Sequence, residues 1–398
     1  MHSSALFFWA VLAVYAAMNA YILARLFQTL SGCGIFRGMA CVALCFFALC
    51  FPLGRLLASI LPDGLYRLIA VLGYLYISPM IYGFLITAVA DVLRLLNGIV
   101  AITHTPPPFS LGARVNIVFT ILLMSLLVTL AGAWNAYVPA VVRHEIRWGA
   151  ERGAAAAQTP GSIRIAIISD LHLGAFRGAG YLKKIVGILS SENPDIVLFA
   201  GDTVDDAAFL RATERRRAAA DVLSSLKPRL GAWAVMGNHD YYAGADEFKS
   251  FLDETPVRLL RDEAVKPEGE LLLVGRDDRT VMRIGGRREG IDGIIRKYVG
   301  EYGRGDGSIP MIVMDHQPFD LEDSENSGAT LQVSGHTHRG QLFPVNLIVA
   351  LMYEKHYGLY RKGATHYYIS SGVGVWGPPV RTVGRPEVVI LDLRREGA

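Results

Sequence analysis

The sequence predicts a chain of two parts, four transmembrane helices followed by an α/β domain. The 398 residues are 52% hydrophobic, which is high for a soluble enzyme, and four long apolar segments lie in the first 140 residues. After residue 162, short apolar runs alternate with helical patterns, which is typical of βαβ units with a largely parallel sheet. We therefore divide the chain into a multi-span membrane anchor at 1–140, a juxtamembrane linker at 141–162 and the α/β domain at 163–398.

Each apolar segment in the first part has about the 20 residues that a helix needs to cross a bilayer. The segments are Ser4–Ala24, Met39–Leu61, Leu68–Val89 and Val115–Tyr137. Trp9, Tyr66 and Trp134 lie near segment ends, as interfacial anchors do. We expect the first segment to remain as an uncleaved helix, because no Lys or Arg precedes it. Since no ionisable residue is evident at mid-depth, we interpret the unit as an anchor rather than a transporter.

The charges around these segments indicate which compartment and partners to expect. Lys and Arg are almost evenly divided between the two sides, with a slight excess that favours a cytoplasmic α/β domain. The net charge of +3 is only weakly basic and does not indicate a nucleic-acid partner. All four cysteines lie in the first 50 residues, which leaves none for a disulfide in the α/β domain. We expect a multi-pass membrane protein whose partners are the lipid bilayer and a substrate.

Five apolar runs in the α/β domain each end in polar side chains. The runs are Ile163–Ser169, Ile196–Ala200, Ala232–Met236, Met311–Met314 and Leu331–Ser334. Helical patterns at Tyr181–Ser191 and Ala207–Leu226 separate the first three. Sites in parallel sheets form beyond the carboxyl ends of the strands. We therefore expect the polar residues that follow these runs to meet at one edge.

The residues after the runs are Asp, Asn and His, which suit a pair of divalent ions. Two such ions about 3.5–4 Å apart can stabilise both oxygens of a phosphoryl transfer and lower the pKa of an attacking water. Two positive ions at such a short distance need an anion between them, and we expect Asp202 to be this bridging ligand. The other expected ligands are Asp170, His172 and His338 for one ion, and Asn238, His316 and His336 for the other. Oxygen and imidazole ligands without thiolates fit Mn, Fe or Zn, with Mn favoured.

The stretch Gly237–Asp240 carries a further candidate, His239. It follows the expected ligand Asn238 but is expected to leave the turn in another direction, as a general acid or as a donor to a phosphoryl oxygen. We expect Asp240 to orient its ring, and Gly237 to allow the sharp turn after the strand. Two acids follow Asp202 at a short distance: Asp206 is interpreted as a helix N-cap, and Asp205 as a partner of a site residue.

The ordered motifs Asp-x-His, Gly-Asp, Gly-Asn-His-Asp, His and Gly-His-x-His resemble those of the calcineurin-like metallophosphoesterases. Here they are Asp170/His172, Gly201/Asp202, Gly237–Asp240, His316 and Gly335–His338. The resemblance covers about residues 163–393 and extends to membrane-associated bacterial members. It implies a four-layer αββα sandwich, two packed β-sheets flanked by helices, with the dimetal centre at one edge. It also implies that Asp202 bridges the ions and that His239 lies near the phosphate. Arg339 stands where that branch usually has glycine; the larger side chain could add a phosphate contact or lie exposed, and we expect it to be exposed.

The expected function is that of a membrane-anchored dimetal phosphoesterase, which hydrolyses a phosphoester or pyrophosphate bond. Anchoring favours a lipid-linked substrate, such as the UDP-diacylglucosamine that members of the resembled family cleave. A phosphodiesterase acting on a soluble nucleotide and a catalytically inactive signalling or scaffold protein are the alternatives. The apolar stretch Val345–Tyr353 is too short to span a bilayer. We interpret it either as a core segment or as an apolar flap at the site mouth that touches membrane or acyl chains.

Overall fold

The computed structural model describes residues 2–57, 60–100, 110–149, 161–302 and 309–396. The chain forms two compact units, which are described separately. The helical unit comprises Met1–Trp134 together with Gly377–Thr382. The α/β unit comprises Asn135–Trp376 together with Val383–Ala398.

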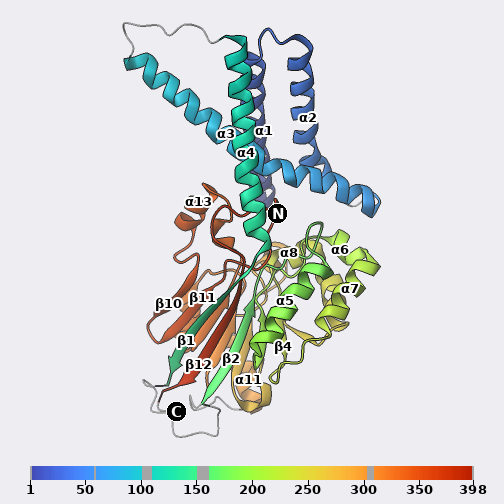
Figure 1. Cartoon of the computed structure of the whole chain (residues 1–398). Helices are drawn as coiled ribbons and strands as arrows, with labels where there is room; N and C mark the ends of the chain where they lie inside the picture. The colour runs from blue at the N-terminus through green and yellow to red at the C-terminus, as the bar shows by residue number, and fades with distance from the viewer. Residues whose placement is uncertain (1, 58–59, 101–109, 150–160, 303–308, 397–398) are drawn as a thin grey trace. The chain divides into compact units, whose positions relative to one another are not determined.

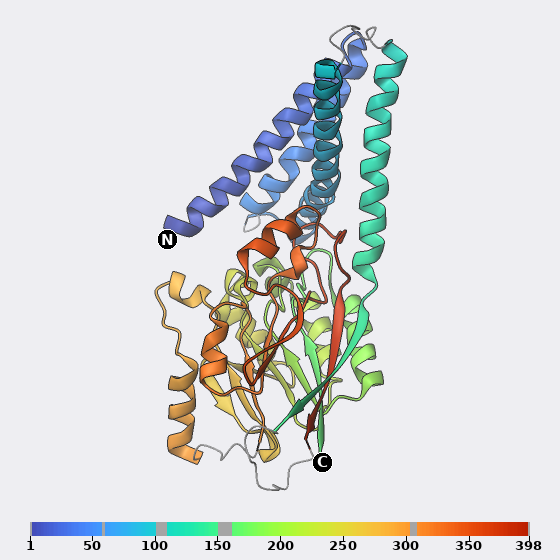
Figure 2. The same cartoon turned by 90° about the vertical axis from the view of Figure 1, so that its left-hand side faces the viewer.

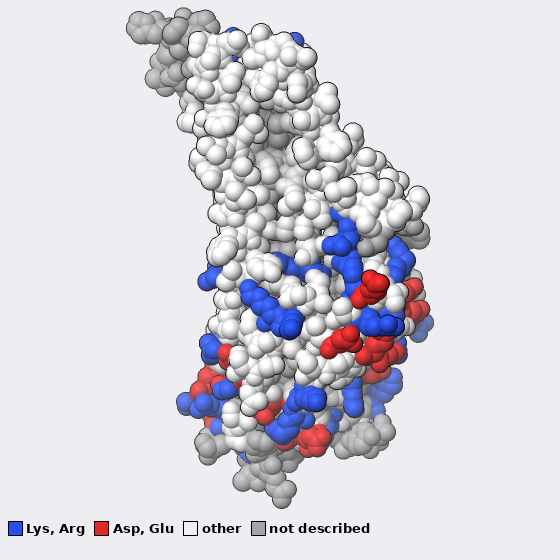
Figure 3. All heavy atoms as spheres, turned by 45° about the vertical axis from the view of Figure 1, so that its right-hand side comes forward, with Lys and Arg blue, Asp and Glu red and all other residues white. Residues whose placement is uncertain are grey.

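The described part of the helical unit contains four long helices, shown in Figure 1: α1 (His2–Thr29), α2 (Gly34–Leu56), α3 (Asp63–Val100) and α4 (Leu111–Tyr137). Each contains a segment that is long and apolar enough to cross a membrane, namely Trp9–Thr29, Gly34–Gly54, Gly64–Leu96 and Leu111–Tyr137. The surface of this unit seen in Figure 3 is almost free of charged side chains. The predicted spans are thus present as apolar helices, with their ends shifted by a few residues.

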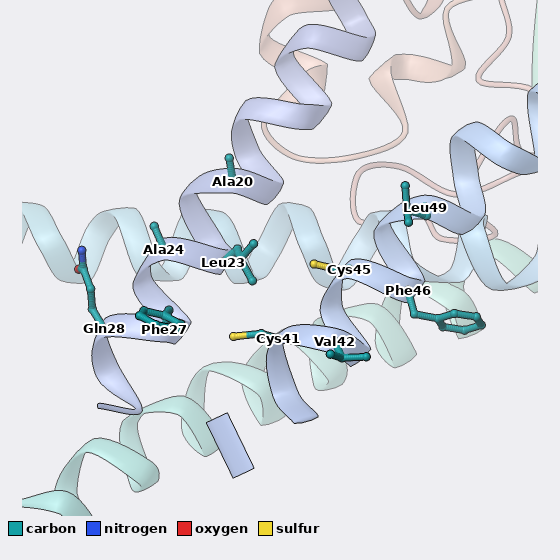
Figure 4. Close-up of a pocket in the computed structure, with 10 residues that line it drawn as sticks. All are labelled: Ala20, Leu23, Ala24, Phe27, Gln28, Cys41, Val42, Cys45, Phe46 and Leu49. Atoms are coloured by element: carbon teal, nitrogen blue, oxygen red, sulfur yellow. The ribbon is translucent and has the colours of Figure 1, made fainter. Parts of the chain in front are cut away.

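Polar contacts join these helices at several points, among them a hydrogen bond from Tyr76 of α3 to Asn19 of α1 and one between Ser78 of α3 and Thr129 of α4. Asp91 of α3, near the end of its span, pairs with Arg25 of α1 at 2.7 Å and with Arg94 at 3.3 Å. Between α1 and α2 lies an open apolar groove with a volume of about 750 Å³ (Figure 4). Its lining residues include Leu23, Phe27 and Leu49. An apolar groove between spans needs no polar partner, because lipid tails are as apolar as its lining.

The α/β unit is built on two six-stranded sheets, with the strand orders β1-β12-β2-β3-β4-β5 and β10-β11-β9-β8-β7-β6. The strands of the first are β1 (Ala140–Trp148), β12 (Glu387–Arg395), β2 (Ser162–Ile168), β3 (Ile196–Phe199), β4 (Ala232–Val235) and β5 (Val257–Leu260). Those of the second are β10 (Gly358–Lys362), β11 (Thr365–Ile369), β9 (Leu331–Ser334), β8 (Met311–Met314), β7 (Leu272–Gly275) and β6 (Glu263–Val265). The run from β2 to β5 is parallel throughout, as predicted.

The described helices of this unit connect and cover the sheets. They are α5 (Ala179–Glu192), α6 (Ala207–Arg211), α7 (Thr213–Leu223), α8 (Asn238–Ala243), α9 (Ala245–Asp253), α10 (Thr280–Arg283), α11 (Ile291–Tyr302), α12 (Leu321–Asn326) and α13 (Val345–Met352), with the short 3₁₀ turns η1 (Pro267–Gly269) and η2 (His338–Gly340). The predicted helix at Ala207–Leu226 is divided into α6 and α7, because Ala212 leaves the helical conformation with ψ 83°. Asp206 caps α6 by accepting a hydrogen bond from the Phe209 amide, as predicted.

The side chains of β2 show how the layers are packed. Ala166 and Ile168 lie in a core with α5, α7 and α9, whereas Ile165 and Ile167 lie in a core shared with the second sheet. Alternation follows from the two-residue period of a strand, which sends successive side chains to opposite faces. On the far face of the second sheet, Ile294 of α11 packs against β7 and β8. The order is therefore helices, sheet, sheet, helix, the four-layer sandwich that was expected (Figures 1 and 2).

The structure differs from the predicted linker at 141–162. Strand β1 occupies its first part and pairs in parallel with β12, from Ala140 opposite Glu387 to Trp148 opposite Arg395. Only Ile146 and Trp148 of this strand are buried, and its charged side chains face outward. Because the strand lies at a sheet edge, its polar composition resembles that of a surface linker. The remaining linker residues 150–160 lie outside the described part of the chain.

Candidate metal centre

The eight residues proposed for the site follow five strands from both sheets. Asp170 and His172 follow β2, Asp202 follows β3, Asn238 and His239 follow β4, His316 follows β8, and His336 and His338 follow β9. Five of them have left-handed backbone conformations, with φ of 55° at Asp170, 49° at His172, 51° at Asp202, 70° at His336 and 49° at His338. Such conformations cost about 1–3 kcal/mol each and cluster at functional sites. The sharp turns send these side chains back toward one another.

The first predicted ligand set comes together as expected. Ligand atoms of Asp170, His172 and His338 lie within 4.8 Å of one another, and all three residues are buried. Nε2 of His172 is 3.0 Å from Nε2 of His338, which is 3.3 Å from a carboxylate oxygen of Asp170. The structure thus brings two imidazole nitrogens and one carboxylate oxygen to a point, a donor set that suits a divalent transition-metal ion.

The second set also converges, around His316. Nδ1 of His316 lies 2.8 Å from the carbonyl oxygen of Ala200, and in the neutral ring donation to that carbonyl leaves Nε2 with a free lone pair. That nitrogen is 3.2 Å from Oδ2 of Asp202, and His336 completes a group whose ligand atoms lie within 4.8 Å. Asn238 is buried, and its Oδ1 forms no hydrogen bond within the described chain. Asp202 is also 3.8 Å from Nε2 of His172, so it faces both sets, as a bridging ligand must.

Glycines at the strand ends give these groups their space. A Cβ on Gly237 would lie 2.1 Å from a carboxylate oxygen of Asp202, and one on Gly335 would lie 2.3 Å from Asp170. We expected Gly237 to serve the turn through its conformational freedom. Its φ of −109° and ψ of 175° are open to any residue, so that explanation is wrong. The glycine is needed because Asp202 occupies the position of a side chain.

The ring of His239 is held by Asp205 and not by Asp240. Nδ1 of His239 and Nδ1 of His172 each lie 3.1 Å from Oδ1 of Asp205. Asp240 instead accepts hydrogen bonds from the amides of Gly237 and Val204, which lock the turn itself. The expectation for Asp240 was therefore wrong, because its side chain folds back on its own turn. Asp205 was noted only as a partner of a site residue, and the structure gives it contacts with two imidazoles.

Neighbouring imidazoles keep the carboxylate of Asp202 charged. Burial would raise the pKa of Asp202, but the charges of His316 and His239 outweigh it and hold that pKa well below the usual range. Burial lowers the pKa of His239. The charge of Asp202 and the hydrogen bond to Asp205 have a larger opposite effect, so the pKa of His239 is raised to about 9. Burial, together with the charge of His316, lowers the pKa of His336 to about 4. His336 is thus neutral at pH 7, which is the form of imidazole that binds a metal.

Two aromatic residues at the site were not identified from the sequence. The ring of Tyr242 lies 5.6 Å from that of His239, and the ring of Tyr353 lies 6.2 Å from that of His336. Tyr242 stands only two residues beyond the Gly237–Asp240 motif, so its position next to the motif was an available signal. Tyr353 follows α13, and nothing local in the sequence links it to the histidines. Arg339, expected to be exposed, is half-buried with its guanidinium 4.3 Å from the centre of the Tyr357 ring.

Comparison with known proteins agrees with this geometry. The sequence profile of the calcineurin-like phosphoesterases matches residues 163–340, which include all eight proposed residues. An uncharacterized metallophosphoesterase of Aquifex aeolicus is 34% identical over 237 residues, which cover 59% of this chain and 86% of that protein. The chain belongs to the calcineurin-like phosphoesterase family. The resemblance seen in the motifs is thereby confirmed.

The relatives of this phosphoesterase include one whose name mentions a membrane. A transmembrane protein with metallophosphoesterase domain from Danio rerio is 32% identical over 243 residues, which is 58% of this chain and 53% of that protein. An uncharacterized metallophosphoesterase of Helicobacter pylori is 33% identical, with 58% and 60% covered. The matched part thus spans less than two thirds of these two relatives. A solved dimetal phosphatase from Danio rerio is similar with a TM-score of 0.35 and 12% identity, covering 56% of this chain and 89% of that one. Together with the four candidate spans, the transmembrane relative supports a membrane protein.

Proposed function

We propose that the protein is a dimetal phosphoesterase that hydrolyses a phosphoester or pyrophosphate bond. The observation that carries the proposal is a pair of buried acceptors, Oδ1 of Asn238 and Nε2 of His316, which form no hydrogen bond within the described chain. A buried polar group without a partner costs about 1–3 kcal/mol. Nε2 of His316 also faces Oδ2 of Asp202 at 3.2 Å, and two acceptors at that distance need a cation or a proton between them. A divalent cation removes both costs.

The proposed ligands are those that the sequence indicated. Asp170, His172 and His338 would hold one ion, Asn238, His316 and His336 the other, and Asp202 would contact both. The carboxylate, amide and imidazole donors fit Mn, Fe or Zn, and we favour Mn. When bound, such ions supply charge neutralisation at the phosphoryl oxygens and lower the pKa of an attacking water.

The residues around the ions have separate tasks in the proposed reaction. The carboxylate of Asp202 would hold both ions and would reduce the repulsion between their positive charges. His239 donates to a phosphoryl oxygen or gives a proton to the leaving oxygen. Asp205 fixes the direction of that ring through its contact with Nδ1, which leaves Nε2 for the substrate. His239 also lies close enough to Asp202 and His172 to bind a metal ion together with them. The His239→Ala variant in the Discussion distinguishes this ligand role from the role toward the phosphate.

The decisive variant is Asp202→Asn in the purified full-length protein. We expect hydrolysis of a chromogenic phosphodiester with Mn²⁺ to fall by at least about 100-fold, the scale for removing one group that stabilises transition-state charge. Metal content, measured by mass spectrometry, should fall as well. The matched control is Asp221→Asn, the same change at an exposed position of α7, which should alter neither quantity. Wild-type turnover and metal content in Asp202→Asn would show that the site is wrongly assigned.

We further propose a lipid-linked phosphoester, such as UDP-diacylglucosamine, as the substrate, and a cytoplasmic position for the α/β unit. The support is the presence of four candidate spans in the same chain, which keep the site near a bilayer. Comparing detergent-dispersed UDP-diacylglucosamine with linear and cyclic nucleotides tests the substrate. Faster turnover of the nucleotides would favour the soluble alternative, and metal-loaded protein without turnover would favour a scaffold. Protease protection of the α/β unit in sealed inside-out vesicles would contradict the cytoplasmic assignment.

A further inference from the structure

The α/β unit begins at the end of the sheet that carries the proposed metal centre, which is the edge formed by the carboxyl ends of the parallel strands. Strand β1 runs parallel to β12, with Ala140 opposite Glu387, and β12 runs antiparallel to β2. The starts of β1 and β12 therefore lie at the edge where β2 ends and Asp170 follows. The candidate span in α4 ends at Tyr137, directly before β1. Connectivity alone thus brings the end of a span to the metal-bearing edge.

The last turn of α4 is fixed to this edge by polar contacts within the α/β unit. Asn135 donates to the carbonyl of Gly384, on the loop before β12, at 2.7 Å. Arg177, on the loop after β2, donates to the carbonyl of Ala136 at 2.6 Å. Lys184 of α5 donates to the carbonyl of Tyr137 at 2.9 Å. The end of the span is therefore an ordered part of the catalytic unit and not a free tether.

A second connection is found on the loop that precedes β12. The chain leaves the α/β unit after Trp376, contributes Gly377–Thr382 to the helical unit, and returns at Val383. Within the helical unit, the amide of Arg381 donates to the carbonyl of Gly132 in α4 at 2.9 Å. Two separate passages between the units thus occur at the edge where β1 and β12 begin.

Exposed apolar side chains are concentrated at the same end, on α13. No residue of this helix is buried, and Leu347, Ile348, Leu351 and Met352 are 53%, 57%, 89% and 59% exposed. The interpretation of this stretch as a core segment is therefore wrong. Figures 1 and 2 show α13 at the end of the α/β unit where β1 begins. The helix directly precedes Tyr353, whose ring lies near His336.

A second segment of the α/β unit, Met282–Arg287, also has exposed apolar side chains. Met282 and Ile284 are 49% and 67% exposed, and Arg283 and Arg287 beside them are also exposed. The guanidinium of Arg279, directly before α10, lies 4.9 Å from the centre of the Phe319 ring, and the centre of that ring is 4.9 Å from the centre of the Tyr353 ring, so this segment lies near the end of α13. Apolar side chains next to arginines are typical of surfaces that enter the headgroup region of a bilayer.

We propose that α13 and the Met282–Arg287 loop form a bilayer-contacting rim, with anionic lipid headgroups at the arginines and acyl chains at the apolar side chains. A bilayer is the occupant because the chain itself ends a candidate span at this edge and returns to the helical unit from it. The rim would hold the opening of the metal centre at the membrane surface. A phosphoester on a membrane lipid would then reach the site without leaving the bilayer. The contact itself does not depend on the proposed reaction.

The test measures contact with lipid in the full-length protein. Cys33, Cys41, Cys45 and Cys50 are first replaced by serine, and the protein is reconstituted in nanodiscs of phosphatidylcholine and phosphatidylglycerol. A single cysteine is then introduced as Leu351→Cys, as Ile284→Cys or, for the control, as Ser225→Cys, and labelled with an environment-sensitive fluorophore. Ser225 is exposed on the loop before β4, at the opposite edge of the sheet. Nitroxide-labelled phospholipid serves as the quencher.

We expect the emission from positions 351 and 284 to fall at least about two-fold when the quencher lipid is included, because interfacial side chains lie within the headgroup and acyl boundary. Emission from position 225 should not change. Absence of quenching at 351 and 284, or equal quenching at all three positions, would overturn the proposal. A blue-shifted but unquenched label would do so too, since a protein surface would then cover the rim. Because no turnover is measured, failure here is distinct from failure of the proposed hydrolysis.

Discussion

Removal of the charge of Asp205 tests whether one carboxylate positions two imidazoles. Its Oδ1 lies 3.1 Å from Nδ1 of His172 and 3.1 Å from Nδ1 of His239, and its side chain is 12% exposed. In the Asp205→Asn variant, the neutral carbonyl oxygen accepts hydrogen bonds more weakly than the carboxylate. The NH₂ group of the amide can only donate, so it cannot accept a hydrogen bond from the N–H of either imidazole. Hydrogen bonds to charged groups contribute about 1.5–3 kcal/mol. Loss of one such bond corresponds to a decrease in activity of about 10- to 100-fold. This is the range found when a carboxylate that hydrogen-bonds a functional histidine is replaced.

The assay is steady-state hydrolysis of a chromogenic phosphodiester by the purified full-length protein with Mn²⁺. We expect kcat to fall by about 10- to 100-fold, the range above, with a smaller change in KM, because the ring of His239 loses its orientation but the substrate keeps its other contacts. The control is Asp206→Asn, the same change at the neighbouring residue, whose carboxylate caps α6. Asn caps a helix about as well as Asp does, so its kinetics should match the wild type. Wild-type kcat in Asp205→Asn would refute the positioning role.

Three further outcomes are expected. In His239→Ala, kcat should fall by about 10²- to 10⁴-fold while two metal ions per chain are retained; loss of one ion would instead make His239 a ligand. Gly237→Ala should impair both activity and thermal stability, because its Cβ would lie 2.1 Å from Asp202. The control is Gly187→Ala in α5, where the Cβ meets nothing within 4 Å, and this change should stabilise the protein by up to about 1 kcal/mol. Removal of metal by a chelator should abolish turnover and lower the melting temperature, with recovery on adding Mn²⁺; activity that survives chelation would exclude the dimetal proposal.

Much of the candidate site was predictable because each ligand is local to a strand end. Five short apolar runs, each followed by Asp, Asn or His, indicate both the strands and the side chains that leave them. Parallel pairing brings the turns after β2, β3 and β4 to one end of the first sheet, and those after β8 and β9 to one end of the second. Only the packing of the two sheets brings these two groups of turns together. The partner of His239 was different. Asp240 is the next residue in the sequence, whereas Asp205 belongs to the segment after β3, and only the tertiary structure shows that Asp205 makes the contact.

The sequence by itself determined the four apolar helices, the α/β unit and the candidate ligands that follow its strands, because hydropathy, strand periodicity and turn residues are properties of neighbouring positions. Tertiary structure alone decided three other features. Strand β1 became visible only through its pairing with β12, far away in the chain. Gly237 proved necessary because Asp202, from another strand, fills the space of its Cβ. The sequence of helix α13 is apolar whether the helix is a core segment or an exposed flap. Only the tertiary structure shows that no other part of the described chain buries it, because exposure depends on residues that are distant in the sequence.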